Sequence, residues 1–233
     1  MTTCGAFDAN ERVGIVCALE REAALLKPVA SSQLIVDVCG PGPHASAESA
    51  KRLVGDGVKV LMSFGLAGGL DPALGAGTIV VPRAVVYRSH TYRMEPKRHG
   101  ACCARLTRAP ITDHLLTVAE PLTSASAKAT GRVAPELCAV DMETGALAQV
   151  ATDAGCAWLA VRAICDDAAT SFPRWLAAHL QAHAQPPGAL AALRGIARRP
   201  SDLPSTLRLA GADASARRAL RWVAIELGLC HAR

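Results

Sequence analysis

Two acidic clusters, each placed just after an apolar run, constrain this chain more than any other feature of its sequence. The first is VDMETGA, residues 140–146, and the second is VRAICDD, residues 161–167. Between them lie a periodic apolar segment that ends at Gly155 and a short apolar run over residues 156–164. This pattern predicts strand, helix and strand, with carboxylates just beyond the ends of both strands. Ligands bind at this edge of open α/β sheets, and carboxylates there suit a reaction whose transition state is cationic.

The rest of the chain alternates apolar runs with amphipathic segments, as α/β proteins do. Strands are expected where the runs are apolar and β-branched, over residues 13–19, 34–39, 58–64, 78–86, 133–140 and 157–164. Helices are expected where the apolar period is helical, over residues 20–26, 45–53, 142–153, 173–183, 189–198, 205–209 and 214–229. The glycine-rich segment 65–69 and the polar, basic stretch 87–132 are expected to form loops, the latter with short strands. The alternation predicts an α/β sandwich in one domain.

Composition narrows the class of protein. The chain has 233 residues, of which 51% are hydrophobic and only 3% aromatic, so Ala, Val and Leu must fill its core. No apolar run approaches the roughly eighteen residues of a membrane span, and acidic residues precede the first apolar stretch, so a cytoplasmic location is expected. The nine cysteines are scattered without a CxxC pair. Neither a disulfide framework nor a metal site is expected, although Cys102 and Cys103 lie near His99.

The formal charge of +5 is concentrated at one end of the chain. Residues 171–233 contain nine arginines against three acidic residues and carry +6, so the first 170 residues carry −1. The sequence has no basic stripe interleaved with aromatics and no helix-turn-helix pattern, so no nucleic-acid partner is expected. The basic segment is interpreted either as solvated helix faces or as a surface attracted to an anionic membrane. Trp175 and Trp222 would then lie at the membrane interface or, alternatively, anchor the core.

Four segments carry a resemblance to a known family. They are GIVCALEREA, SFGLAGGLDPALGAGTIVVP, AVDMETGALAQVA and WLAVRAICDDA, and together they span residues 13–170. In this order they resemble the nucleoside phosphorylase superfamily and, within it, the methylthioadenosine nucleosidase branch. The resemblance implies a three-layer α/β/α sandwich with a central mixed sheet, a flexible N-terminus over residues 1–12 and a helical C-terminal extension over residues 172–233. That extension resembles the tail of hopanoid-associated phosphorylase-like proteins, which are thought to remove adenine from adenosylhopane.

The resemblance implies how the carboxylates act on a purine nucleoside. Cleavage of the purine–ribose bond leaves an oxocarbenium-like sugar and a poor leaving group, and Asp166 matches the family's general acid, which protonates the purine. Such an acid accelerates the reaction by about 10²–10⁴-fold, and burial or the neighbouring Asp167 must raise its pKa. A solvated strand end or a helix cap is the structural alternative for both aspartates. Glu22, rather than its neighbour Glu20, matches the glutamate that deprotonates the attacking water.

Further residues are assigned to substrate binding through the same resemblance. Glu143 matches the family's glutamate that grips the ribose hydroxyls, and Met142 would lie against the sugar; a glutamate in the first turn of a helix is otherwise favoured by the helix dipole alone. Arg162 either holds the nucleophile or pairs with Asp166 or Glu143, and Asp141 is interpreted as a helix cap. The remaining residues expected against the substrate lie in the two glycine-containing segments: Leu66, Ala67, Gly68 and Gly40.

The sequence also departs from the family pattern. Leu66 stands where a Ser or Thr usually helps to hold the acid, and two prolines flank Gly42 and remove N–H donors from a possible phosphate nest. No aromatic residue lies between Thr107 and Ala157. Recognition of the base is therefore expected from backbone groups near residues 123–127, or from Phe64 and Tyr87.

Three functions remain open on the sequence alone. The first is hydrolysis of a 5′-substituted adenosine, such as adenosylhopane, with water activated by Glu22 and without a cofactor. The second is phosphorolysis, with Arg88 or Arg93 binding phosphate. The third is a nucleoside- or adenine-binding protein that has lost turnover. Relatives in the family are homodimers whose neighbouring subunit completes the pocket, so a homodimer is expected here.

Overall fold

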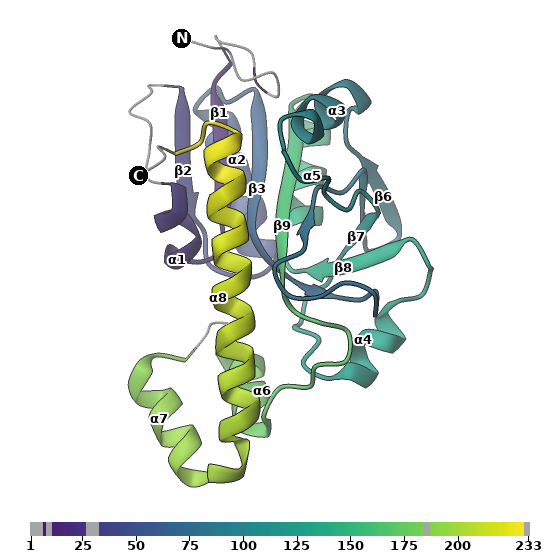
Figure 1. Cartoon of the computed structure of the whole chain (residues 1–233). Coiled ribbons are helices and arrows are strands. Elements are labelled where there is room, and N and C mark those ends of the chain that lie inside the picture. Colours follow the sequence, from purple (N-terminus) through teal and green to yellow (C-terminus); the bar gives the residue numbers. More distant parts are fainter. Residues whose placement is uncertain (1–6, 8–10, 27–32, 184–186, 231–233) are drawn as a thin grey trace.

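The computed structural model describes residues 7, 11–26, 33–183 and 187–230 of the chain (Figure 1). Nine strands form one mixed sheet. They are β1 (Val13–Cys17), β2 (Leu34–Val38), β3 (Val60–Gly69), β4 (Ile79–Val80), β5 (Ala84–Tyr87), β6 (His90–Arg93), β7 (His114–Thr117), β8 (Leu137–Asp141) and β9 (Ala157–Asp166). The α-helices of the described residues are α1 (Glu20–Ala23), α2 (Pro43–Gly55), α3 (Pro96–Ala104), α4 (Ala125–Gly131), α5 (Thr144–Asp153), α6 (Arg174–His183), α7 (Ala189–Arg198) and α8 (Leu203–Glu226).

The long strand β3 joins the two halves of the sheet. Its first part runs parallel to β1 and to β9, whereas its last residues, Gly68 and Gly69, pair antiparallel with Val140 and Ala139 of β8. From β8 the sheet continues through β7, β5 and β6. The ends of β3, β8 and β9 therefore meet at one place, which is where the sequence puts its glycine-rich segment and both acidic clusters.

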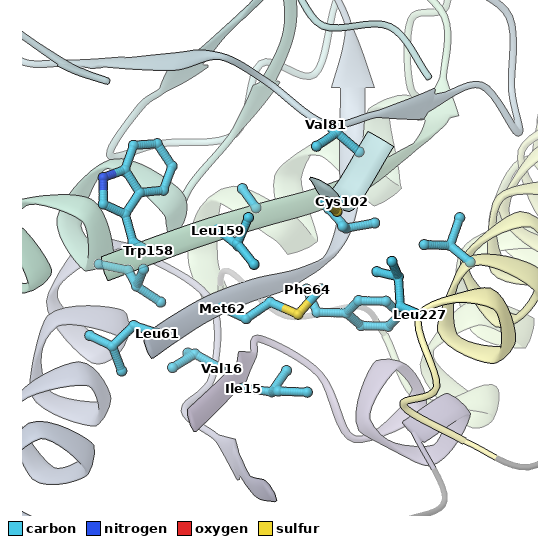
Figure 2. Packing of buried hydrophobic residues seen from close by; sticks show 14 of the residues in the cluster. Ile15, Val16, Leu61, Met62, Phe64, Val81, Cys102, Trp158, Leu159 and Leu227 are labelled. Carbon is cyan, nitrogen blue, oxygen red and sulfur yellow. The ribbon is translucent and has the colours of Figure 1, made fainter. Parts of the chain in front are cut away.

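Helices cover both faces of the sheet. In Figure 1 the long helix α8 lies in front of the sheet, over β1 and β3 and beside β9, while α2 and α5 lie behind the sheet. Between these layers lies a continuous core of Val, Ile, Leu and Ala with few aromatic residues. Figure 2 shows Phe64 and Met62 of β3 beside Ile15 and Val16 of β1, with Leu227 approaching from the C-terminal segment. Burial of this apolar surface, at roughly 25 cal/mol per Å², is the main force that holds the strand ends in place.

The α/β fold with a mixed central sheet that the sequence predicts is confirmed, and most strands begin within three residues of their predicted positions. The prediction of a loop over residues 65–69 is wrong, because β3 continues to Gly69 to pair with β8. The prediction of a single strand over residues 78–86 is also wrong. The chain breaks at Pro82 into β4 and β5, since proline lacks the N–H that a strand interior needs.

The stretch 87–132 differs most from expectation. Besides the short strands β6 and β7 it forms two helices, α3 and α4. Pro96 occupies the first turn of α3, a position where its missing N–H costs nothing. Ser124 caps α4, and its Oγ accepts a hydrogen bond from the backbone N–H of Ala127. Both are helix-start signals that the polar composition of this stretch obscures.

The C-terminal extension is helical, but not with the predicted boundaries. Residues 203–226 form one helix, α8, where two helices over 205–209 and 214–229 are predicted. Gly211 does not interrupt it, because the cost of about 1 kcal/mol for a glycine in a helix is small beside the burial of its C-terminal half. The lower half of α8, together with α6 and α7, projects beyond the sheet (Figure 1). No helix in the described part of the chain is both long and apolar enough to span a membrane.

Most of the N-terminal segment, residues 1–6 and 8–10, lies outside the described residues. Phe7 is buried against the core, and the Glu11 carboxylate pairs with both terminal nitrogens of Arg98 at 2.8 and 2.9 Å.

Candidate active site

A cavity of about 190 Å³ opens where β3, β8 and β9 end. Its polar lining is dominated by carboxylates, whereas most of its remaining wall is apolar. The residues that line it are Ala18, Leu19, Arg21, Glu22, Pro41, Leu66, Ala67, Gly68, Val118, Pro121, Leu122, Val140, Asp141, Met142, Glu143, Cys165, Asp166, Phe172 and Leu180. All three carboxylates singled out by the sequence, Glu22, Glu143 and Asp166, are among them.

Glu22 lies in the short helix α1 and is buried. Its two carboxylate oxygens accept backbone N–H groups, Oε1 from Leu66 at 2.9 Å and Oε2 from Leu19 at 3.0 Å. Burial raises the pKa of this carboxyl, while Arg162 and the two backbone hydrogen bonds oppose the rise. A buried carboxylate that is held in one orientation and has a raised pKa suits a general base.

The close approach of Glu22 depends on a glycine in β3. A Cβ at Gly65 would lie 2.7 Å from Glu22 Oε1 and 2.7 Å from Arg162 Nη1. These distances are shorter than any normal contact, so a larger side chain would displace both groups. The glycine at position 65 therefore leaves room for the side chains of Glu22 and Arg162, and the segment is part of a strand instead of a flexible loop.

Glu143 begins helix α5 and is almost fully buried. Its Oε1 accepts the N–H of Gly42 at 3.0 Å, and its Oε2 lies 3.5 Å from Arg162 Nη2. Burial raises the pKa of Glu143 to about 7, Arg162 opposes the rise and Asp141 adds to it. Each oxygen of this carboxylate thus has its own partner, and the residue lines the cavity.

Arg162 lies beneath the cavity floor and is buried. Its main ionic partner is Asp141, at 2.7 Å, and it also contacts Ser63 Oγ at 2.5 Å and the backbone oxygen of Leu66 at 3.2 Å. The predicted pairing with Asp166 is wrong, and the predicted pairing with Glu143 exists only as the longer 3.5 Å contact. Arg162 therefore organises the floor under Glu22 and Glu143.

Asp141 has two roles in this arrangement. Its Oδ2 caps helix α5 by accepting the N–H of Thr144 at 3.1 Å, as the sequence predicts. The same carboxylate balances the charge of Arg162, and its Oδ1 accepts the hydroxyl of Thr117 at 2.5 Å. The Asp141 side chain thus caps a helix and also takes part in a buried ion pair. The sequence pattern alone does not reveal the second role.

Asp166 ends β9, and its side chain is 7% exposed. It is not a solvated strand end. Burial raises its pKa, Lys128 lowers it through its charge and a hydrogen bond, and Asp167 has a smaller raising effect. The Sγ of Cys165 lies 3.1 Å from Asp166 Oδ1. The direction of the shift agrees with the requirement that this carboxyl hold a proton near neutral pH.

The sequence did not single out Lys128, which lies in helix α4 with a side chain only 1% exposed. Its ammonium group pairs with Asp166 Oδ2 and donates to the backbone oxygens of Asp167, at 2.5 Å, and Thr170, at 3.4 Å. Nothing in the segment ASAKATG marks this lysine as special, because its burial depends on how α4 packs against the end of β9.

The other predicted substrate-binding residues lie as follows. Leu66, Ala67, Gly68 and Met142 line the cavity, and a Cβ at Gly68 would lie 3.4 Å from Asp166 Oδ2. Pro41, rather than the predicted Gly40, forms the wall at the end of β2.

The aromatic residue that lines the cavity is not one that the sequence predicts. Phe64 is fully buried in the core (Figure 2), and Tyr87 packs on helix α5, where a Cβ at Gly145 would be 2.3 Å from Tyr87 Cβ. Phe172 lines the cavity instead, beside Leu180 of α6, so the C-terminal extension forms part of the wall. Residues 123–127 instead support the segment that leads into the extension, through Thr123 O, which accepts the N–H of Phe172 at 2.9 Å.

Arg88, in the turn between β5 and β6, and Arg93, at the end of β6, are exposed and do not line the cavity. Arg88 has a positive φ of 56° and stacks over the Tyr87 ring at 5.0 Å. Of the two adjacent cysteines, Cys103 contacts His99, with its Sγ 3.7 Å from His99 Nε2. Within the described residues, no three His, Cys, Asp or Glu side chains gather as a metal site would require.

The fold and the site together define an α/β protein with a ligand cavity lined by buried carboxylates. The chain belongs to the phosphorylase superfamily, whose profile matches residues 28–134 and 116–185. A search of curated proteins found no significant match.

Solved structures share this fold along nearly the whole chain. The 5′-methylthioadenosine/S-adenosylhomocysteine nucleosidase of Colwellia psychrerythraea 34H, in complex with adenine, has a TM-score of 0.71 and 18% identity, with 93% of this chain and 94% of that chain covered. The corresponding nucleosidase of Neisseria meningitidis, in complex with methylthio-immucillin-A, has a TM-score of 0.69 and 15% identity, covering 93% and 97%. Futalosine hydrolase of Helicobacter pylori strain 26695 has a TM-score of 0.65 and 13% identity, covering 93% and 98%. At these identities the likeness concerns the fold.

Proposed function

We propose that this protein hydrolyses the bond between adenine and ribose in a 5′-substituted adenosine. The observation that carries this proposal is the placement of three buried carboxyl groups, Glu22, Glu143 and Asp166, around one largely apolar cavity. Nucleosidases of the same fold, two of them in complex with adenine or a nucleoside analogue, add support.

Each carboxyl group has a distinct role in the proposed reaction. Asp166 protonates the purine as the bond breaks, and Glu22 takes a proton from the attacking water on the other face of the sugar. Glu143 accepts hydrogen bonds from the ribose hydroxyls, and its negative charge stabilises the oxocarbenium-like transition state. Preorganised anions inside an apolar cavity act strongly because little water screens them.

Water is favoured as the nucleophile over phosphate. Within the described residues, the only basic side chain in the cavity lining is the exposed Arg21, and two other cations near the site, Arg162 and Lys128, already have acidic partners. A phosphate dianion at this place would need free cationic or N–H donors. Glu22, which already accepts two N–H groups, suits a neutral water instead.

The direct test is adenine release from 5′-substituted adenosines with and without inorganic phosphate. We expect a rate that is independent of phosphate and a free 5′-substituted ribose as the second product. Strict dependence on phosphate and formation of a ribose 1-phosphate would establish phosphorolysis instead. Binding of adenine without cleavage of any adenosine would identify a binding protein that has lost turnover.

We propose further that the 5′-substituent is large and apolar, as in adenosylhopane. The support is the wall formed by Leu19, Pro41, Leu122 and Leu180, to which the C-terminal extension contributes. The variant Leu180→Ser should lower kcat/KM for a long-chain 5′-alkylthioadenosine by about tenfold, because an apolar contact contributes roughly 1–3 kcal/mol of discrimination. Its effect on unsubstituted adenosine should be much smaller, and an equal loss on both substrates would argue against this proposal.

Such a substrate resides in a membrane, and the tip of the extension has a surface suited to one. Leu203 and Leu207, one turn apart at the start of α8, are 42% and 62% exposed and lie close in sequence to the exposed Arg198, Arg199 and Arg208. Trp175 and Trp222 pack on the protein, the first against Gly195 and the second under Arg108. We propose that this leucine–arginine tip contacts anionic lipid.

Sedimentation with vesicles tests the membrane contact. The full-length protein should bind phosphatidylglycerol vesicles more than phosphatidylcholine vesicles, and Leu207→Ser should weaken binding. Equal sedimentation with both vesicle types would count against it.

We also propose that the protein is a homodimer, as family resemblance implies, and light scattering coupled to size exclusion would measure its mass.

A further inference from the structure

The contact between Lys128 and Asp166 has a chemical consequence for the proposed reaction. A buried carboxylate is costly unless a counter-charge is present, and here the counter-charge is an ammonium group, which itself carries acidic protons. Lys128 Nζ has three acceptors, namely Asp166 Oδ2 and the backbone oxygens of Asp167 and Thr170. Three acceptors match the three donors of an ammonium group, whereas a neutral amine would turn its lone pair toward one of them.

We infer that Lys128 is the proton reserve of Asp166, so that the pair delivers to the purine a proton that an isolated carboxylate would already have lost. This inference rests on the proposed function. Lys128 acts through Asp166 and does not reach the substrate, so it is a positioning residue. The pair exists either as ammonium and carboxylate or as amine and carboxylic acid, and both forms hold the same proton.

The proton transfers balance across the reaction. An N–H bond of the Lys128 ammonium breaks as an O–H bond forms on Asp166. That O–H bond breaks as an N–H bond forms on the five-membered ring of the purine, and the electron pair of the glycosidic bond passes into the purine. The oxygen of the attacking water forms a bond to C1′ of the ribose, and Glu22 takes the proton that this water loses, so the protein's net charge is unchanged. Afterwards Glu22 releases this proton to solvent, and Lys128 regains one.

Several groups face the pair from the surrounding elements. Asp167 follows Asp166 and favours the protonated carboxyl, while Cys165 Sγ contacts Asp166 Oδ1 from β9 itself. The Phe172 ring lies 5.9 Å from Lys128 Nζ. Asp213 of α8 and Arg21 of α1 also act on Cys165, and they form an ion pair with each other at 3.2 Å, which limits their effect on the site.

The pH dependence of catalysis separates a proton reserve from a structural support. In the wild type, the alkaline limb of kcat/KM reports loss of the proton that the pair shares. In Lys128→Met that limb reports Asp166 alone, a carboxyl, so it should move to lower pH by at least about one unit. The loss of activity should therefore grow with pH, by roughly tenfold for each unit above the new limb. The control Lys97→Met, which removes an exposed lysine of α3, should follow the wild-type profile.

Chemical rescue provides a second readout that does not depend on the stability of one variant. Lys128→Ala leaves space for a small molecule, and n-propylamine should restore the alkaline limb. Amines of different basicity should shift that limb in proportion to their own basicity. Propanol, which has nearly the same shape without the charge, should restore nothing.

The outcomes distinguish the inference from the proposed function. With 5′-methylthioadenosine and 5′-alkylthioadenosines as probes, a wild type that releases no adenine would refute the proposed function. If the wild type cleaves these probes while Lys128→Met shows a pH profile of kcat/KM with the same shape and a lower rate at every pH, that result would overturn the proton reserve alone. Equal rescue by propanol and propylamine would overturn it as well.

Discussion

Two carboxyl groups that line the cavity, Glu22 and Asp166, lie in different surroundings. Glu22 and Asp166 are both buried carboxyls, and burial raises the pKa of each. Glu22 is held by the backbone N–H groups of Leu19 and Leu66, whereas Asp166 is held by the ammonium of Lys128. A backbone N–H does not give up its proton at any pH that a protein survives. An ammonium group does, so in the proposed reaction the neighbours suit one carboxyl to accept a proton and the other to donate one.

This contrast explains how two acidic side chains can perform opposite steps at one pH. The environment of Glu22 stabilises its anion and supplies no proton, which suits a base that waits for water. The anion of Asp166 is stabilised by the ammonium group of Lys128, which carries a proton that it can transfer. The predictions below test this contrast in order of the size of the expected effect.

Removal of the acid should have the largest effect. Asp166→Asn should lower kcat for adenine release by about 10²–10⁴-fold, the usual contribution of a general acid. Asp167→Asn alters the next residue, whose side chain accepts the Thr170 hydroxyl at 2.6 Å outside the cavity, and should cost far less. Because Asp166→Asn leaves Lys128 without a counter-charge, the double variant with Lys128→Met separates catalysis from folding. Similar losses in both aspartate variants would contradict the assignment.

Removal of the base should rank second. Glu22→Gln keeps the shape of the side chain but places an NH₂ group against one backbone N–H, and it should lower kcat by about 10²–10³-fold. Glu20→Gln, on the exposed side of the same helix, should remain within about twofold of the wild type. Equal rates for the two glutamate variants would show that Glu22 has no part in catalysis.

Displacement of the base without removing it should have a smaller effect. Gly65→Ala places a Cβ 2.7 Å from both Glu22 Oε1 and Arg162 Nη1. We expect a loss of roughly 1–3 kcal/mol in the free energy of unfolding, as overpacking usually causes, together with a fall in kcat of about tenfold. Gly75→Ala, whose Cβ meets no atom within 4 Å, should change neither quantity. Thermal denaturation and adenine release would measure both.

The burial of Glu143 should appear in the pH dependence of stability. Folded Glu143 holds its proton to about pH 7, whereas an unfolded glutamate releases it near 4.5. Between these values the folded state binds more protons, so the free energy of unfolding should fall as pH rises. Glu143→Gln should remove part of this slope, on the order of 1–3 kcal/mol between pH 4.5 and 7. Urea titrations at several pH values would measure it, and an unchanged slope would contradict the burial of this carboxyl.

The sequence predicts the parts of this fold in which local pattern and tertiary packing agree. The apolar runs that form β1 and β9 are buried along nearly their whole length, and the run that forms the edge strand β2 is half-buried. These runs could be recognised without a structure. Asp141 likewise lies at the end of its strand, and the structure pairs it with Arg162 at 2.7 Å. The carboxylates of the cavity were identifiable because they follow such runs directly.

Other parts depend on contacts that no local pattern contains. Lys128 is a polar residue in a polar stretch, and only the packing of α4 on the end of β9 buries it. The segment 65–69 reads as a loop because of its glycines, yet its last residues pair with β8 and its first admits Glu22. Phe172 and Leu180 reach the cavity because the extension folds back, which an aromatic-poor sequence gives no reason to expect.

The most direct test of the account changes the leaving group instead of the protein alone. A p-nitrophenyl riboside departs as a stable phenolate and needs no proton from an acid, but its cleavage still needs an activated water. We predict that Asp166→Asn, strongly slowed on adenosines, retains most of the wild-type rate on this substrate, while Glu22→Gln loses activity on both. If the two variants lost activity on both substrates to the same extent, the assignment of Asp166 as proton donor and Glu22 as proton acceptor would be contradicted.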